Sequence, residues 1–177
     1  MAAAYLLSRA PAATGDGTQR LDLLRSAAKF NSGAIMSDAE SKTRIETAAL
    51  IRRYLEAFNA GDSEGMIACL TDEVIHDVNQ GERRTGKDKF RAFNARMTHH
   101  YRERLHGIAV MVSKDGQRAA AEFNVNGTYL ATDSGLPEAK GQTYKLPAGT
   151  FFAIRDGKIA RVTTYYNLTD WIAQVSG

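Results

Sequence analysis

The sequence predicts an α+β domain in which N-terminal helices pack on one face of a curved, mostly antiparallel sheet. Apolar residues recur at helical spacing over residues 38–60, whereas strand-like segments follow one another from residue 107 onward. Asp-Gly pairs at 115–116 and 156–157 separate strand-like runs and are typical of β-hairpin turns. Helices first and a long antiparallel sheet afterwards is an α+β arrangement.

The composition limits the functions to be considered. A chain of 177 residues fits one domain of ordinary size. Its 23 basic and 20 acidic side chains leave a net charge of only +3, which is too weak to indicate a nucleic-acid-binding protein. No run approaches the roughly 18 apolar residues of a membrane span. We therefore expect a soluble, cytoplasmic protein that binds neither nucleic acid nor membranes.

The first 35 residues differ from the rest, being rich in Ala, Gly, Ser and Thr. They are expected to form a flexible N-terminal extension, or to result from a start site assigned too far upstream. Met36 is followed by Ser37 and Asp38, which are good helix N-cap residues. The single folded domain is therefore expected to span residues 36–177.

Three helices are predicted before the sheet. The first covers residues 38–60 and ends at Gly61, after which Asp62 or Ser63 can cap a short second helix. The third begins near Gly86. Their predicted inner faces carry Ile45, Ile51, Tyr54, Leu55 and Phe58 in the first helix, Met66, Ile67 and Leu70 in the second, and Phe90, Phe93, Met97, Tyr101 and Leu105 in the third.

The strands are predicted from alternating apolar residues and from turn residues. The segments 118–131 and 143–154 are joined by a longer loop that contains Gly135 and Pro137. A last short helix is expected over residues 169–175. The complete set of predicted strands is 74–79, 107–113, 118–131, 143–154 and 158–167.

Asp77 is the first candidate for chemistry, because a carboxylate interrupts the apolar alternation of its strand. It shares a strand face with Ile75 and Asn79, and we expect this face to line a pocket; an aspartate near a turn that points to solvent is the alternative. Tyr54, on the inner side of the first helix, is the second candidate, with a structural core residue as its alternative. If both face one cavity, the aspartate can take a proton while the phenol hydrogen-bonds the oxygen that becomes negative.

Several segments together resemble a known family. The sequence RYLEAFNAGD at 53–62, the IHD at 75–77 and the PAGTFF at 147–152 look like corresponding parts of the ketosteroid isomerase family. The HDVNQG at 76–81 and the GLP at 135–137 are similar to the ketosteroid isomerase-related branch of the nuclear transport factor two-like (polyketide cyclase-like) superfamily. This resemblance covers residues 41–171.

The resemblance implies a cone-shaped, cystatin-like barrel whose helices and bent sheet enclose an apolar pocket, commonly in a homodimer. It also implies that Tyr54 is the oxyanion donor and Asp77 the general base. The family's second oxyanion acid falls on Gly149, and losing one such donor costs about 10²- to 10³-fold in rate, so reduced or altered activity is expected. Residues expected around an apolar small-molecule substrate are Asn79, Phe93, Met97, Gly149, Thr164 and Tyr166.

The leading hypothesis is a cofactor-free isomerase or lyase that removes a proton next to a carbonyl. A non-catalytic small-molecule-binding or dimeric scaffold domain is the alternative. A polyketide cyclase or epoxide hydrolase would need further acid and base groups, which the sequence does not identify. No metal site is expected, because His99 and His100 are adjacent on a helix and diverge by about 100°.

Overall fold

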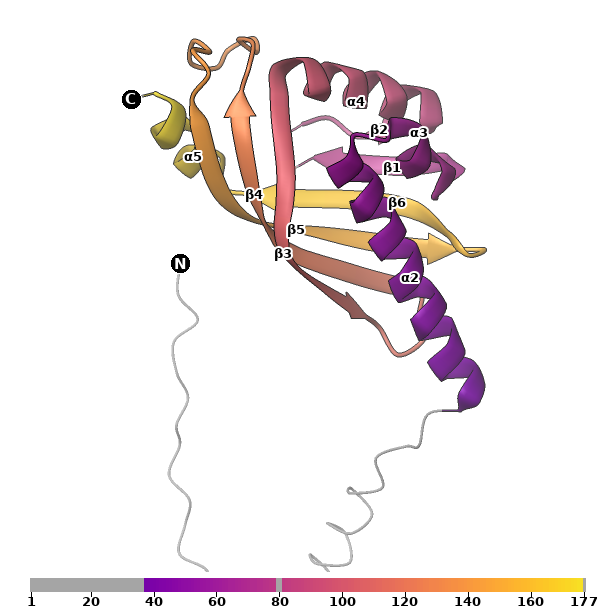
Figure 1. Ribbon diagram of the computed structural model, residues 1–177. Coiled ribbons are helices and arrows are strands. Elements are labelled where there is room, and N and C mark those ends of the chain that lie inside the picture. Colours follow the sequence, from indigo (N-terminus) through magenta and orange to yellow (C-terminus); the bar gives the residue numbers. More distant parts are fainter. Residues whose placement is uncertain (1–36, 79–80, 177) are drawn as a thin grey trace, which may run out of the picture. The chain divides into compact units, whose positions relative to one another are not determined.

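The computed structural model describes residues 37–78 and 81–176 (Figure 1). The expected extension, residues 1–35, and the candidate site residue Asn79 lie outside the described residues. In chain order the elements are α2 (Asp38–Ala60), α3 (Ser63–Ala68), β1 (Leu70–Val78), β2 (Arg84–Thr85), α4 (Lys87–His100), β3 (Tyr101–Val112), β4 (Arg118–Tyr129), β5 (Thr143–Arg155), β6 (Lys158–Tyr166) and α5 (Leu168–Val175).

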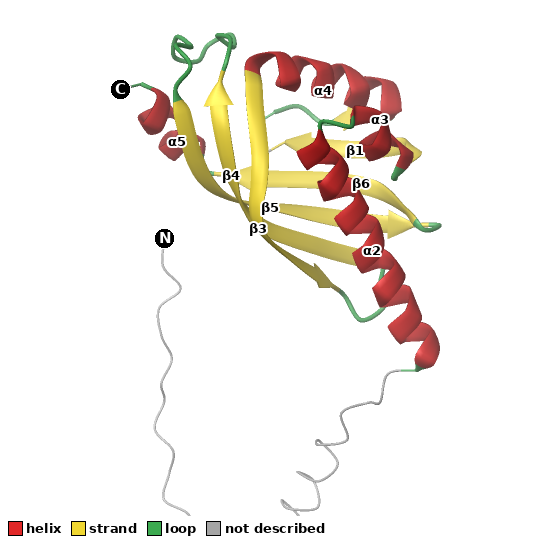
Figure 2. Ribbon diagram, viewed as in Figure 1, coloured by secondary structure: helices red, strands yellow, loops and turns green. Residues whose placement is uncertain are grey.

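The strands form one six-stranded sheet in the order β2-β1-β6-β5-β4-β3. Strands β1 and β6 are parallel, and the other neighbours are antiparallel. The long strands bend strongly, and α2, α3 and α4 lie on one side of the sheet (Figure 2). This mixed α+β arrangement with a curved, unclosed sheet confirms the predicted fold class. Both predicted hairpins, β3–β4 and β5–β6, are present as well.

The helix ends follow the capping residues in the sequence. The Ser37 side chain and Glu40 form a capping box at the start of α2, and Gly61 ends this helix in the left-handed conformation, with φ at 69°. Asp62 then accepts a hydrogen bond from the backbone N–H of Gly65 and starts α3. These two caps set the sharp turn that brings α3 back against α2.

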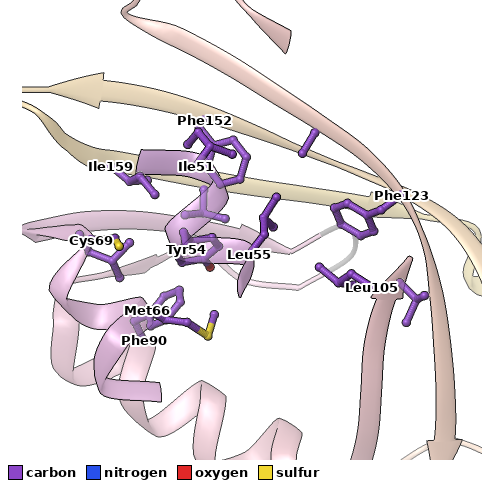
Figure 3. Close-up of a cluster of buried hydrophobic side chains, with 14 of the residues drawn as sticks. Ile51, Tyr54, Leu55, Met66, Cys69, Phe90, Leu105, Phe123, Phe152 and Ile159 are labelled. Atoms are coloured by element: carbon purple, nitrogen blue, oxygen red, sulfur yellow. The ribbon is translucent and has the colours of Figure 1, made fainter. Parts of the chain in front are cut away.

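A buried cluster joins the helices to the sheet. Ile51, Tyr54 and Leu55 of α2 lie among side chains from α3, α4 and the long strands of the sheet (Figure 3). On β4 the odd-numbered residues from Ala119 to Tyr129 are buried, as their alternation predicted. The free Cys69 is buried in the same cluster. Ile45 was expected on the inner face of α2 and is instead 69% exposed.

The third helix is shorter than predicted. It ends at His100, and Tyr101 and Leu105 belong to β3. These two residues are four apart, which fits one face of a helix and also one face of a strand, so the spacing alone did not distinguish the two. The first strand also begins earlier than predicted, at Leu70.

In the part of the chain that the structure describes, no helix has both the length and the apolar character needed to cross a membrane.

Candidate active site

A cavity of about 390 Å³ lies between the helices and the inner face of the sheet. Its wall takes side chains from α2, α4 and α5, from the inward positions of the long strands, and from the loop between β4 and β5. Most of these side chains are apolar or aromatic, as is usual for a small-molecule site. The apolar part includes Leu55, Phe58, Phe93, Met97, Leu105, Phe123, Val125 and Leu146.

Asp77 does not face this cavity, so the predicted orientation was wrong. Val74 and His76 are the inward, buried residues of β1, and Asp77 lies on the opposite face. Its carboxylate accepts two hydrogen bonds from the Arg83 guanidinium, at 2.8 and 3.1 Å. These bonds hold the pKa of Asp77 below its ordinary value. Counting the apolar face from Ile75 rather than from Val74 placed every side chain of the strand on the wrong side.

Tyr54 does line the cavity. Its ring packs edge-on against Phe152, with centroids 5.8 Å apart, and burial raises the pKa of its hydroxyl. Among the described residues this hydroxyl has no hydrogen-bond partner. Four further sequence candidates also lie on the wall, namely Phe93, Met97, Thr164 and Tyr166.

Gly149 lies on the outer face of the sheet, contrary to the expected place beside the ligand. It pairs with Glu122 and Tyr165, whereas its neighbours Ala148 and Thr150 line the cavity. The missing side chain at Gly149 therefore does not widen the pocket. The inward positions of β5 are the even-numbered ones.

His76 is brought into the cavity by the same alternation that turns Asp77 out. The ring is 4% exposed and packs against Phe90 and Phe93, with centroid distances of 4.9 and 4.7 Å. Burial, with a contribution from the charge of Arg84, lowers the pKa of His76 to about 4. The imidazole is therefore uncharged at neutral pH.

Glu103 is the carboxylate that sequence reasoning missed on β3. It lines the cavity, and burial raises its pKa, although a hydrogen bond from Tyr144 opposes that effect. The Tyr144 hydroxyl donates to Oε1 of Glu103 at 2.6 Å. The two residues come from β5 and β3, and Gly127 of β4 pairs with both. A Cβ on Gly127 would overlap the Tyr144 ring, so the glycine leaves the space that the ring occupies.

A second carboxylate, Asp133, comes from the loop between β4 and β5. It is 7% exposed, and it accepts hydrogen bonds from Arg96 at 3.2 Å and from the hydroxyl of Tyr101 at 3.2 Å. Tyr166 also lines the cavity, and its pKa is raised by burial and then by the charges of Glu103 and Asp133. One part of the wall thus combines two carboxylates with several phenols.

Comparison with known proteins identifies the family. Residues 51–162 match the SnoaL-like domain. The chain belongs to the SnoaL-like family. No curated protein gives a match.

Three solved structures are similar to this SnoaL-like chain, and each is described as a candidate polyketide cyclase. The protein from Silicibacter sp. TM1040 is 60% identical, covering 74% of this chain and 96% of that one, with a TM-score of 0.73. The protein from Pseudomonas putida KT2440 is 61% identical over 71% and 95% of the two chains, with a TM-score of 0.70. The protein from Xanthomonas campestris pv. campestris is 51% identical over 76% and 99%, with a TM-score of 0.74.

A more distant solved structure has the same fold as this SnoaL-like domain. A nuclear transport factor two-like protein from Burkholderia pseudomallei K96243 is 17% identical, covers 75% of this chain and 98% of its own, and has a TM-score of 0.62. Family and fold together confirm the superfamily that the sequence resembled.

Within the described residues of the SnoaL-like domain, no cluster of three or more His, Cys, Asp or Glu side chains could hold a metal ion. The polar groups that the cavity offers include carboxylates, phenols, an imidazole, guanidinium groups, an amide and hydroxyls. Such groups can move protons and hydrogen-bond a developing negative charge.

Proposed function

We propose that this SnoaL-like domain is a cofactor-free enzyme of the cyclase or isomerase type, in which Glu103 removes a proton next to a carbonyl of an apolar small molecule. The observation that carries the proposal is the environment of this carboxylate. Asp133 is paired with Arg96, whereas Glu103 accepts a hydrogen bond from a phenol and has no cationic partner among the described residues. A carboxylate whose pKa is raised by burial is a stronger base than an exposed one once it is ionised.

The groups of the cavity account for both the proton and the electron pair of the broken C–H bond. The C–H proton goes to Glu103, and the electron pair of that bond moves to the carbonyl oxygen. A phenol of Tyr166 or Tyr54 donates a hydrogen bond to this oxygen, since both line the cavity and both keep their protons at neutral pH. In a cyclase the enolate carbon then attacks a second carbonyl of the same molecule, and Glu103 returns its proton to the alkoxide oxygen that forms. In an isomerase Glu103 returns the proton to another carbon of the enolate system.

The similarity to candidate polyketide cyclases supports a substrate with more than one carbonyl group. A cyclase needs acid and base groups beyond the pair that the sequence indicates. Glu103, Asp133 and the neighbouring phenols provide such groups. Asp77 has no role in this proposal, because Arg83 binds it on the opposite face of β1.

Hydrogen–deuterium exchange tests the proposal. 2-Tetralone, an apolar ketone with acidic α-protons, is incubated with the protein in D₂O, and deuterium uptake is followed by NMR. The wild type is expected to accelerate exchange, and Glu103→Gln should reduce this acceleration by at least about 100-fold, the scale of a lost general base. Tyr166→Phe and Tyr54→Phe then show which phenol assists. Full acceleration by Glu103→Gln would refute the proposed base.

A non-catalytic binding domain is the second candidate. Asp77 and Gly149 occupy the two positions at which the ketosteroid isomerase family has its functional acids. Neither residue lies on the cavity wall, and this favours a domain that binds without catalysis. In that case 2-tetralone would raise the melting temperature of the wild type without any gain in exchange rate.

We also propose that the domain forms a homodimer through the outer face of its sheet. Phe151 and Tyr165 are 48% and 52% exposed there, and their rings pack edge-on with centroids 5.8 Å apart. Exposed aromatic side chains of neighbouring strands are typical of protein interfaces.

A further inference from the structure

The wall of the cavity carries an arginine, Arg84, that no carboxylate of the described residues neutralises. Arg84 of β2 is half-buried, and its identified contacts are the backbone carbonyl of Glu82, at 3.1 Å, and the face of the Phe93 ring, 4.6 Å from the guanidinium carbon. No acidic side chain of the described residues forms an ion pair with it. The other arginine of the wall, Arg96, is already bound to Asp133. The cavity therefore has one guanidinium with its charge unmatched.

His76 pairs with Arg84 across β1 and β2, and one of its ring nitrogens has no hydrogen-bond partner among the described residues. The residue is 96% buried, since its exposure is 4%, and its Nδ1 atom has no hydrogen bond within the described structure. Its ring contacts are the aromatic rings of Phe90 and Phe93. A buried polar side chain without a partner is costly unless a ligand or water satisfies it. Both Arg84 and His76 line the cavity, so a bound molecule can reach them.

The two groups lie far from the proposed base. Arg84 and His76 belong to β2 and β1 at one edge of the sheet, and Glu103 belongs to β3 at the other edge. Three strands lie between β1 and β3, which corresponds to about 19 Å along the sheet and to less across its curve. The wall between them is largely apolar. Among the described residues the cavity thus has a carboxylate without a cationic partner, Glu103, at one end and a guanidinium without an acidic partner, Arg84, at the other.

We propose that the Arg84 and His76 end binds an anionic oxygen group of the substrate, a carboxylate or an enolate, while the reacting carbon lies at Glu103. The assignment of the reacting end rests on the proposed function. The substrate class is accordingly an apolar carbonyl compound with an acidic group remote from the reacting carbon. The Arg84 guanidinium supplies charge and two donors, and the uncharged His76 ring can donate one further hydrogen bond.

A matched pair of probes tests this inference by binding alone. 6-Hydroxy-2-naphthoate carries a carboxylate on an apolar body, and its methyl ester has the same body without the charge. The wild type is expected to bind the acid about tenfold more tightly than the ester in isothermal titration calorimetry at pH 7, as one charge-assisted contact implies. Arg84→Gln should abolish this preference with ester affinity kept, and Arg84→Lys should retain part of it.

Arg83→Gln is the matched control. It also removes one guanidinium charge, but Arg83 binds Asp77 and does not line the cavity. It should keep the tenfold preference. Equal affinity of the wild type for acid and ester, or a preference that survives in Arg84→Gln, would overturn the inference. Since the readout is binding, failure here is distinct from failure of Glu103→Gln to slow exchange.

Discussion

The hydroxyl of Tyr144 reaches across a whole strand to hydrogen-bond Glu103, with an Oη–Oε1 distance of 2.6 Å. Strand β4 lies between the two residues, and at the crossing point it carries Gly127. The row Glu103, Gly127, Tyr144 therefore acts as a unit. Glu103 supplies the carboxylate, Gly127 leaves space for the Tyr144 ring, and Tyr144 supplies the hydrogen-bond donor.

Tyr144→Phe should shift the pH dependence of the proposed reaction. The Tyr144 hydrogen bond lowers the pKa of Glu103 against the effect of burial, so its loss raises that pKa further. Because the base acts in its ionised form, the rising limb of deuterium exchange against pH should move to higher pH. Tyr165→Phe, on the outer face of the sheet, is the control and should leave the pH dependence of the exchange rate unchanged. An unshifted limb in Tyr144→Phe would mean that this hydrogen bond does not tune the reacting group.

Gly127→Ala should destabilise the domain, because the added Cβ overlaps the Tyr144 ring. Overpacking of this kind costs about 1–3 kcal/mol, and displacing the ring should also shift the exchange profile as Tyr144→Phe does. Gly149→Ala is the control on β5, where the new Cβ would meet the Ala121 carbonyl at an ordinary 3.7 Å. Urea unfolding of both variants measures the difference, and equal stabilities would contradict the proposed role of Gly127.

His76 should make stability depend on pH below neutrality. Its pKa is lowered from 6.5 to about 4 in the folded state, so between these values the unfolded chain binds more protons. The free energy of unfolding therefore falls as the pH is lowered from 6.5 towards 4, and the contribution is constant above that window. The loss is on the order of 3 kcal/mol.

His76→Phe keeps an aromatic ring against Phe90 and Phe93 and removes the titration. The difference in unfolding free energy between wild type and variant, measured in urea from pH 4 to pH 7, isolates this effect from the other acidic groups. A difference that does not vary with pH would show that the imidazole is not held uncharged by burial.

Phe151→Asp should separate the proposed homodimer into monomers, because it introduces a charge into an apolar interface. Analytical ultracentrifugation of the wild type and the variant gives the masses directly. Ile45→Asp, at an exposed position of α2, is the control and should leave the mass unchanged. A wild type that is already monomeric at micromolar concentration would end this proposal.

The fold was predictable because its signals are local. Ser37, Gly61 and Asp62 mark helix ends through their own backbone and side-chain preferences, and the two Asp-Gly pairs mark hairpins. Family resemblance supplied the arrangement of these elements. Most of the residues expected around a ligand do line the cavity, since large apolar residues of a helix or strand tend to point inward.

The polar part of the site was not predictable in the same way. On β1 the choice between Asp77 and His76 depends on which of two apolar residues, Val74 or Ile75, faces inward, and local sequence does not decide that. Glu103 lies between Tyr101 and Leu105 on one face of β3. The spacing of Tyr101 and Leu105 also fits a helix, and in a helix Glu103 would not share their face. Asp133 lies in a loop, where no periodicity exists.

The most direct test of the central claim compares two carboxylate variants in one assay. Deuterium exchange into 2-tetralone is measured for the wild type, Glu103→Gln and Asp77→Asn, with folding checked by circular dichroism. The structure predicts that Glu103→Gln loses the acceleration and that Asp77→Asn keeps it within about threefold. The reverse result, exchange lost in Asp77→Asn and kept in Glu103→Gln, would contradict the assignment of the proton acceptor to Glu103.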